Sequence, residues 1–219
     1  QGICSLKFIQ AASRDRLAVL VCKAESSFLI TIAAIRAVAD PGVDPVVPER
    51  CREAAVAMIL LQGESSFEMM FILRARKEGD PWSGQMALPG GHREPQDVTL
   101  AETAARETWE ETGLDLARHG EFLGGLTGVR ANPRSGIDLM VVPQVFELQA
   151  RPSQLAPNHE VQKVLWGDVA DMYSGASRTD ASFPEFNRHG TVPGFKVDDQ
   201  VVWGLTFRML NDLFDAVGR

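Results

Sequence analysis

The chain has 219 residues, an apolar content of 45% and a net charge of −7, which describe an ordinary globular protein of one domain, with or without an appended segment. The negative charge argues against nucleic acid or an anionic membrane surface as a general partner. A small phosphate ester stays open as a ligand, because a bound metal ion can invert the charge of a site. The cysteines, at positions 4, 22 and 51, are odd in number and lack zinc-binding spacing, which indicates free thiols in a reducing, cytoplasmic location.

Residues 1–49 carry the least information about function. An apolar run at 17–38 is interrupted by Lys23, Glu25 and Arg36, so it is not expected to span a membrane, and it lacks the form of a secretory signal. We expect a helical or mixed element that packs on the domain formed by residues 50–219. A contact between two copies of the chain, as in a homodimer, is the less favoured alternative.

Two apolar runs, at 54–61 and 67–74, predict buried strands joined by a short turn, and therefore a β-hairpin. The second run leads into Arg74 and Arg76. Each of these arginines is as well explained by a plain surface charge as by binding to a phosphate. Trp82, in the loop that follows, is expected to pack in the core rather than to line a substrate cleft.

The most informative stretch of the sequence runs from 88 to 114. Its Pro-Gly-Gly sequence at 89–91 predicts a tight turn. Thr99 and Glu102 have the spacing of a capping box, which predicts that a helix begins there, and Gly113 predicts where it ends. The sequence therefore predicts a glycine turn that leads into one well-defined helix.

Three glutamates on this helix, Glu107, Glu110 and Glu111, are spaced at i, i+3 and i+4 and therefore share one face. Carboxylates this close repel one another unless a cation lies among them, and oxygen ligands without sulfur or imidazole favour Mg²⁺ or Mn²⁺. The alternative is a solvated acidic face with Arg106 as an ion-pair partner, but the neighbouring glycine turn favours the metal site. The opposite face, which is expected to pack on the core, carries Ala101, Ala105 and Trp109.

The glycine turn and the sequence R-E-T-W-E-E-T-G-L at 106–114 resemble the signature of the Nudix hydrolase family, G-x5-E-x7-R-E-U-x-E-E-x-G-U, where U is apolar. Three features depart from it. Asp97 stands where the family has Glu, the gap from Asp97 to Arg106 is one residue longer, and Thr108 replaces an aliphatic residue. The resemblance implies an α/β fold, an α/β/α sandwich with a mixed β-sheet between helices. It also implies that the Gly91 carbonyl joins the glutamates at the metal, while Arg106 orients the acids.

A second resemblance, to the coenzyme A pyrophosphatase branch of the family, lies just upstream. Arg76 followed by Gly84 and by the sequence L-P-G-G at 88–91 resembles the motif of this branch, with Leu88 in place of Phe. The second arginine of the motif has no match, because an Asp-Pro pair occupies 80–81, and Arg76 lies one residue too close to Gly84. The predicted substrate-binding residues, including a histidine that adjoins the turn, are Arg76, Gly90, Gly91 and His92.

Beyond the helix, 121–130 and 137–148 are expected to be strands, and Pro143 indicates that the second is an edge strand or contains a bulge. Arginine suits phosphate oxygens. Even so, Arg130 and Arg134, in the turn between the strands, are expected to be solvated.

Residues 157–166 resemble the segment in which many Nudix enzymes carry a further acid before an apolar strand. Glu160 is thus a candidate metal ligand or general base, with a surface glutamate as an equal alternative, and His159 is a less favoured base. Residues 175–200 are expected to contain a substrate-side loop and a short strand. From 201 to 217 the apolar residues have helical spacing, which predicts a helix, and its start, V-W-G-L-T, resembles the closing helix of the coenzyme A branch.

Taken together, these resemblances to the Nudix family imply metal-assisted hydrolysis of a diphosphate that joins a nucleoside to another group. Glu107, Glu110, Glu111 and Gly91 would bind Mg²⁺ or Mn²⁺, and either Glu107 or Glu160 would be the general base. The favoured substrate is coenzyme A or an acyl derivative, which would give 3′,5′-ADP and a phosphopantetheine. The alternatives are ADP-ribose, a nucleotide sugar or a nucleoside triphosphate. An alternative from a different class of protein is a nucleotide-binding sensor without catalysis. The presence of all three acids argues against it.

Overall fold

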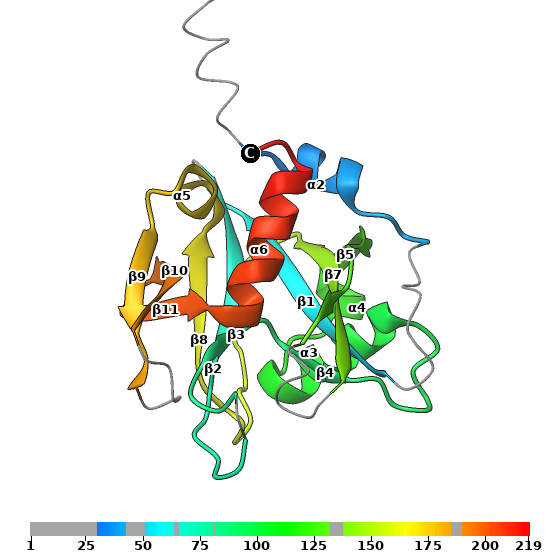
Figure 1. The fold of residues 1–219 in the computed structure, drawn as a ribbon. Coiled ribbons are helices and arrows are strands. Elements are labelled where there is room, and N and C mark those ends of the chain that lie inside the picture. The colour runs from blue at the N-terminus through cyan, green and yellow to red at the C-terminus, as the bar shows by residue number, and fades with distance from the viewer. Residues whose placement is uncertain (1–29, 43–50, 64–65, 81, 132–137, 185–189) are drawn as a thin grey trace, which may run out of the picture.

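The computed structural model describes residues 30–42, 51–63, 66–80, 82–131, 138–184 and 190–219, and Figure 1 labels its elements. In these residues the larger sheet has eight strands: β1 (Arg52–Gln62), β2 (Phe67–Arg74), β3 (Met86–Ala87), β4 (Gly90–His92), β5 (Gly120–Gly125), β6 (Val129–Arg130), β7 (Leu139–Leu148) and β8 (Val161–Asp168). The smaller sheet has three: β9 (Arg178–Ser182), β10 (Thr191–Val197) and β11 (Gln200–Trp203). The helices are α2 (Ile32–Val38), α3 (Leu100–Thr112), α4 (Leu116–His119), α5 (Val169–Ser174) and α6 (Gly204–Ala216).

The larger sheet is mixed and is built around β1. This strand runs parallel to β7, with Arg52 opposite Leu139 at one end and Leu61 opposite Leu148 at the other. On its other side it is antiparallel to β2, so the predicted β-hairpin is confirmed. The connection between the parallel strands passes through α3, as expected for strands that no short turn can join.

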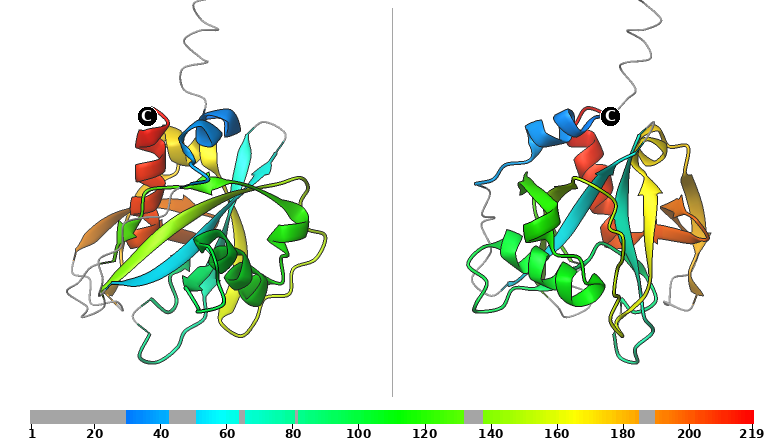
Figure 2. Two further views of the ribbon diagram at one scale, coloured as in Figure 1. Left: turned by 90° about the vertical axis from the view of Figure 1, so that its right-hand side faces the viewer. Right: turned by 180° about the vertical axis from the view of Figure 1, so that it is seen from behind.

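Both faces of β1 are buried, which is why its sequence is a continuous apolar run. Met58 and Leu60 face a cluster that includes Phe214 of α6, whereas Ile59 faces a cluster that includes Ala104 of α3. Figure 2 shows the sheet between α6 on one side and α3 on the other. The predicted α/β/α sandwich with a mixed sheet between helices is therefore confirmed.

The core-facing side of α3 differs in part from the prediction: Ala101 and Ala105 are partly buried against the core, but Trp109 is not. Trp109 is 56% exposed, and Leu100, Ala104 and Thr108 are buried instead. Thr108 tolerates burial because its hydroxyl donates to the Ala104 carbonyl oxygen at 2.7 Å. Counting apolar side chains favoured the face with the tryptophan, but a threonine whose hydroxyl is satisfied by its own helix packs like a small apolar residue.

Pro143 does not mark an edge strand, because β7 lies between β1 on one side and β5 and β6 on the other. Its carbonyl oxygen accepts from the Leu126 N–H at 2.9 Å. The imide nitrogen of Pro143 points to the same side as this oxygen, into the break between β5 and β6. No ladder hydrogen bond is lost there, so the proline fits an interior strand.

The C-terminal helix begins later than predicted. Residues 200–203 form β11, which pairs with β10 in the smaller sheet, and α6 starts only at Gly204. Val202 is buried in β11, and a helix would also have buried this apolar residue, so the apolar pattern did not distinguish a strand from a helix. The region predicted as a loop with one short strand therefore contains β9 and β10, and the third strand of the smaller sheet takes the start of the predicted helix.

The N-terminal segment reaches the core through α2, whose Ile35 is fully buried. Asp40 then forms a backbone bridge with Gly125 of β5. Cys51 is a free thiol. No helix in the described part of the chain has the length and apolar character needed to cross a membrane. The expectations for residues 1–29, with Cys4 and Cys22, and for Arg134 lie outside the described residues.

Candidate active site

Helix α3 is fixed at both ends by the caps that its sequence predicted. The Thr99 hydroxyl accepts from the Glu102 N–H at 3.1 Å, and the Glu102 carboxylate accepts from the Thr99 N–H at 3.3 Å. Gly113 ends the helix in the left-handed conformation, with a φ of 72°. These caps set where α3 begins and ends. Its last two turns carry the three candidate acids.

The glycine segment is a short strand rather than the predicted tight turn. Gly90 and Gly91 belong to β4, which pairs antiparallel with β1. At Gly90 the φ is 152°, and an added Cβ would overlap the Ala55 carbonyl oxygen and lie 2.6 Å from Val56 Cα. At Gly91 an added Cβ would lie 2.5 Å from the carboxyl carbon of Glu107. Glycines are needed here because the backbone passes directly between β1 and an acid of α3.

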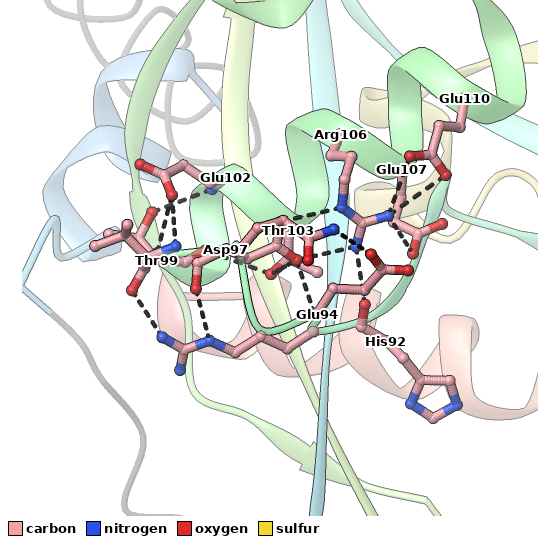
Figure 3. A network of polar contacts seen from close by, with 12 residues as sticks. His92, Glu94, Asp97, Thr99, Glu102, Thr103, Arg106, Glu107 and Glu110 are labelled. Carbon is pink, nitrogen blue, oxygen red and sulfur yellow. Dashed lines mark hydrogen bonds and ion pairs between the residues drawn. The ribbon is translucent and has the colours of Figure 1, made fainter.

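Arg106 connects the glycine segment to the acids (Figure 3). Its guanidinium donates from Nε and Nη2 to the two oxygens of Asp97, at 3.0 and 2.9 Å, and from Nη1 to Glu107 at 3.0 Å. Nη2 also donates to the His92 carbonyl oxygen at 3.0 Å. The hydrogen bonds from Arg106 lower the pKa of Asp97 to about 2, and Asp97 in turn raises the pKa of Arg106. Asp97, where the signature has glutamate, thus provides a two-point anchor for Arg106.

Replacing Asp97 with asparagine is expected to lower the free energy of unfolding by about 1 to 2 kcal/mol near neutral pH. Because the pKa of Asp97 is depressed in the folded state, its stabilisation is present above its ordinary pKa of 3.8 and is lost as the pH falls toward about 2. Urea unfolding of the two proteins should therefore converge as the pH is lowered through this window. The exposed Asp180→Asn change is the control, and a constant difference at every pH would contradict this account.

The three glutamates of α3 share a face but differ in exposure. The side chain of Glu111 is 4% exposed, that of Glu107 is 18% exposed and that of Glu110 is 51% exposed. Burial raises the pKa of Glu111 to about 7, and it also raises the pKa of Glu107. In the described part of the chain, no three His, Cys, Asp or Glu side chains already converge as a metal site.

These acids nevertheless fit a divalent cation. Glu107 and Glu111 are oxygen donors, and burial disfavours their charged forms even beside Arg106 and Arg74, so a divalent cation would stabilise both carboxylates. The Gly90 N–H donates to Glu111 at 2.9 Å, which orients one carboxylate toward the glycine segment. Glu110 accepts from Arg106 Nη1 at 3.3 Å and lies at the exposed margin of this group. Mg²⁺ and Mn²⁺ match such a set of hard oxygen donors.

A cavity of about 1250 Å³ adjoins the acids, on the side of the sheet that α6 covers. Glu107, Glu111 and Glu160 line it, whereas Glu110 does not. Gly90, Gly91 and His92 also line it, although the His92 ring is exposed and points away from the Arg106 network in Figure 3. Trp82 is half-buried in the cavity lining, so the expectation that it packs in the core is wrong.

Arg74 lines the cavity, while Arg76 is exposed and lies outside the lining. Arg74 donates from Nη2 to Asp80 at 2.7 Å, and its Nη1 lies 3.9 Å from Glu111. The sequence did not separate the two arginines because the pairing of β2 with β8 becomes irregular after Leu73, where strand alternation no longer applies. Asp80, at the unmatched arginine of the branch motif, therefore fixes Arg74 beside the acids.

Glu160 precedes β8 and lines the same cavity. Its carboxylate is 41% exposed and lies 3.7 Å from Lys77 Nζ. His159 is exposed and does not line the cavity. Arg130 lines it but also binds Asp138 through two hydrogen bonds of 2.6 Å. Sequence reasoning missed Lys77 and Asp80, for which no spacing rule gave a signal.

Comparison with known proteins identifies the family. The family model of the NUDIX domain matches residues 52–186. An uncharacterized protein of Schizosaccharomyces pombe is 34% identical over 151 residues, which cover 60% of this chain and 45% of that protein. The mitochondrial coenzyme A diphosphatase NUDT8 of Homo sapiens is 30% identical over 162 residues, covering 72% and 66% of the two chains. The chain thus spans about half to two thirds of the length of these relatives.

The fold agrees with this assignment. The crystal structure of a MutT/nudix family protein from Enterococcus faecalis superposes with a TM-score of 0.52 at 15% identity, over 80% of this chain and 65% of that one. Such a likeness concerns the fold alone, while the family model matches more than half of the chain. The chain belongs to the Nudix hydrolase family.

Proposed function

We propose that the protein is a metal-dependent hydrolase of coenzyme A or acyl-coenzyme A, with 3′,5′-ADP and a phosphopantetheine as products. The observation that carries the proposal is that the buried carboxylate of Glu111 and the partly buried carboxylate of Glu107 lie beside a glycine strand and line a cavity of nucleotide size. The similarity to a coenzyme A diphosphatase supports this choice of substrate.

Glu107, Glu110, Glu111 and the Gly91 carbonyl would bind Mg²⁺ or Mn²⁺. When bound, the ion would neutralise phosphate charge and lower the pKa of a water molecule. Arg106 keeps Glu107 in place through its 3.0 Å contact and is itself fixed by Asp97. Arg74, anchored by Asp80, can offer its guanidinium to the diphosphate.

Glu160 is the favoured general base. The attacking water forms a bond to phosphorus, its proton passes to a carboxylate, and the bond from that phosphorus to the bridging oxygen breaks. Arg106 donates directly to Glu107, so this carboxylate already has a hydrogen-bond partner and is assigned to metal binding. The Glu160 carboxylate lines the cavity and has Lys77 only at 3.7 Å.

A substrate panel tests the proposal. With Mg²⁺ or Mn²⁺, we expect kcat/KM for coenzyme A and acetyl-coenzyme A to exceed that for ADP-ribose, a nucleotide sugar and an oxidised nucleoside triphosphate by about tenfold or more. Chromatography of the products should show 3′,5′-ADP. A preference for another compound would replace the substrate but keep the hydrolase, whereas tight binding of nucleotides without turnover would favour the sensor alternative.

A further inference from the structure

The N-terminus of α6 opens into the same cavity as the acids. Gly204, Thr206 and Arg208 all line it, and Figure 1 shows α6 beginning at the end of β11. The residue before the helix is Trp203, and no side chain caps its first turn. The first N–H groups of an uncapped helix lack partners within the helix and carry the positive end of its dipole. This end of the cavity is therefore suited to an anion.

Thr206 gives a second and independent indication of a ligand. The residue belongs to the cavity lining, yet it is only 6% exposed. In the part of the chain that the structure describes, its hydroxyl has no hydrogen-bond partner, unlike the buried hydroxyls of Thr108 and Thr112 in α3. A hydroxyl in a cavity lining that has no protein partner is free to donate a hydrogen bond to a ligand.

The charges around this helix end also favour an anion. The first turn of α6 contains no acidic residue. Arg208, one turn further on, has a side chain that is 62% exposed, and its Nε lies 4.0 Å from Asp212, which is a long ion pair. The guanidinium thus keeps donors for another partner. Of the acids that line the cavity, Glu107 and Glu111 belong to α3 and Glu160 precedes β8, so none of these three is part of α6.

We propose that the N-terminus of α6, with Thr206 and Arg208, binds a phosphate monoester of the substrate that is separate from the diphosphate being cleaved. The site then selects nucleotides with a further phosphate on the sugar, such as the adenosine 3′,5′-bisphosphate half of coenzyme A. The inference rests on the proposed function for its choice of nucleotide. Its physical basis, an anion at an uncapped helix end, does not depend on the chemistry at the acids.

Titration calorimetry with two ligands that contain no diphosphate tests this site. In the presence of Mg²⁺, we expect 3′,5′-ADP to bind about tenfold more tightly than 5′-AMP, since the two differ only in the 3′-phosphate. Thr206→Val, which keeps the side-chain shape, and Arg208→Gln should each reduce this ratio about fivefold. Arg208 is exposed, so its replacement tests the site even if Thr206→Val is poorly folded.

Thr191→Val and Arg118→Gln are matched controls, because both residues are exposed and lie outside the cavity. They should keep the wild-type ratio. Equal affinities of the wild type for 3′,5′-ADP and 5′-AMP would overturn the inference, as would an Arg208→Gln protein that keeps the wild-type affinity ratio. Neither result would bear on the hydrolysis of coenzyme A. A tenfold affinity ratio in the wild type that falls in both variants would support the phosphate site, even if the substrate panel rejects coenzyme A.

Discussion

Glutamine in place of Glu111 is expected to lower kcat about 10³-fold while making the metal-free protein more stable. The change preserves the shape of the side chain and one acceptor for the Gly90 N–H, which donates to Glu111 at 2.9 Å. It removes the negative charge that a divalent ion requires. Steady-state kinetics at saturating Mg²⁺ measures the loss, and an unchanged kcat would contradict the role of this acid.

The gain in stability follows from the burial of Glu111. Its pKa in the folded protein is raised from 4.5 to about 7, so ionisation opposes folding increasingly as the pH rises between these values, and fully above them. At about pH 8, in EDTA, the free energy of unfolding of the variant should therefore exceed that of the wild type by about 2 kcal/mol. Excess Mg²⁺ should stabilise only the wild type. Glu78→Gln, at an exposed residue outside the cavity, should change neither property.

Alanine in place of Gly90 is expected to reduce the free energy of unfolding by about 4 kcal/mol. The added methyl group would overlap the Ala55 carbonyl oxygen and approach Val56 Cα to 2.6 Å. Both atoms belong to the backbone of β1, the centre of the larger sheet, so they cannot move aside. Urea unfolding measures the change, and β4 should also separate from Glu111 and reduce hydrolysis.

Gly79→Ala is the matched control for this experiment. Gly79 also has a positive φ, 81°, but an added Cβ there would meet nothing within 4 Å. Its replacement therefore carries only the backbone penalty of about 1 kcal/mol. If the two substitutions cost the same, the close contact of Gly90 with β1 is not what constrains this position.

Local signals in the sequence predicted what depends on local contacts. The capping box at Thr99, the end of α3 at Gly113 and the hairpin of β1 and β2 involve residues close together in the chain. The wrong expectation for Trp109 arose because the burial of Thr108 depends on a hydrogen bond within the helix that an apolar pattern does not reveal.

The parts of the site that the sequence did not reveal depend on contacts between distant elements. Arg74 lies beside Glu111 because the fold brings the end of β2 close to α3. Thr206 lies in the cavity only because β11 turns the chain back before α6 begins. Residue spacing along the chain does not predict contacts of this kind. In contrast, Glu107 and Glu111 are one helical turn apart, so helical periodicity alone predicted that they lie together.

The buried face of α6 has a practical consequence for truncation. The family model ends at residue 186, before this helix, and it begins after α2. Yet Leu210 and Phe214 of α6 and Ile35 of α2 are fully buried in one apolar cluster. A polypeptide trimmed to residues 52–186 would display this cluster to water, and we expect it to aggregate during expression rather than fold.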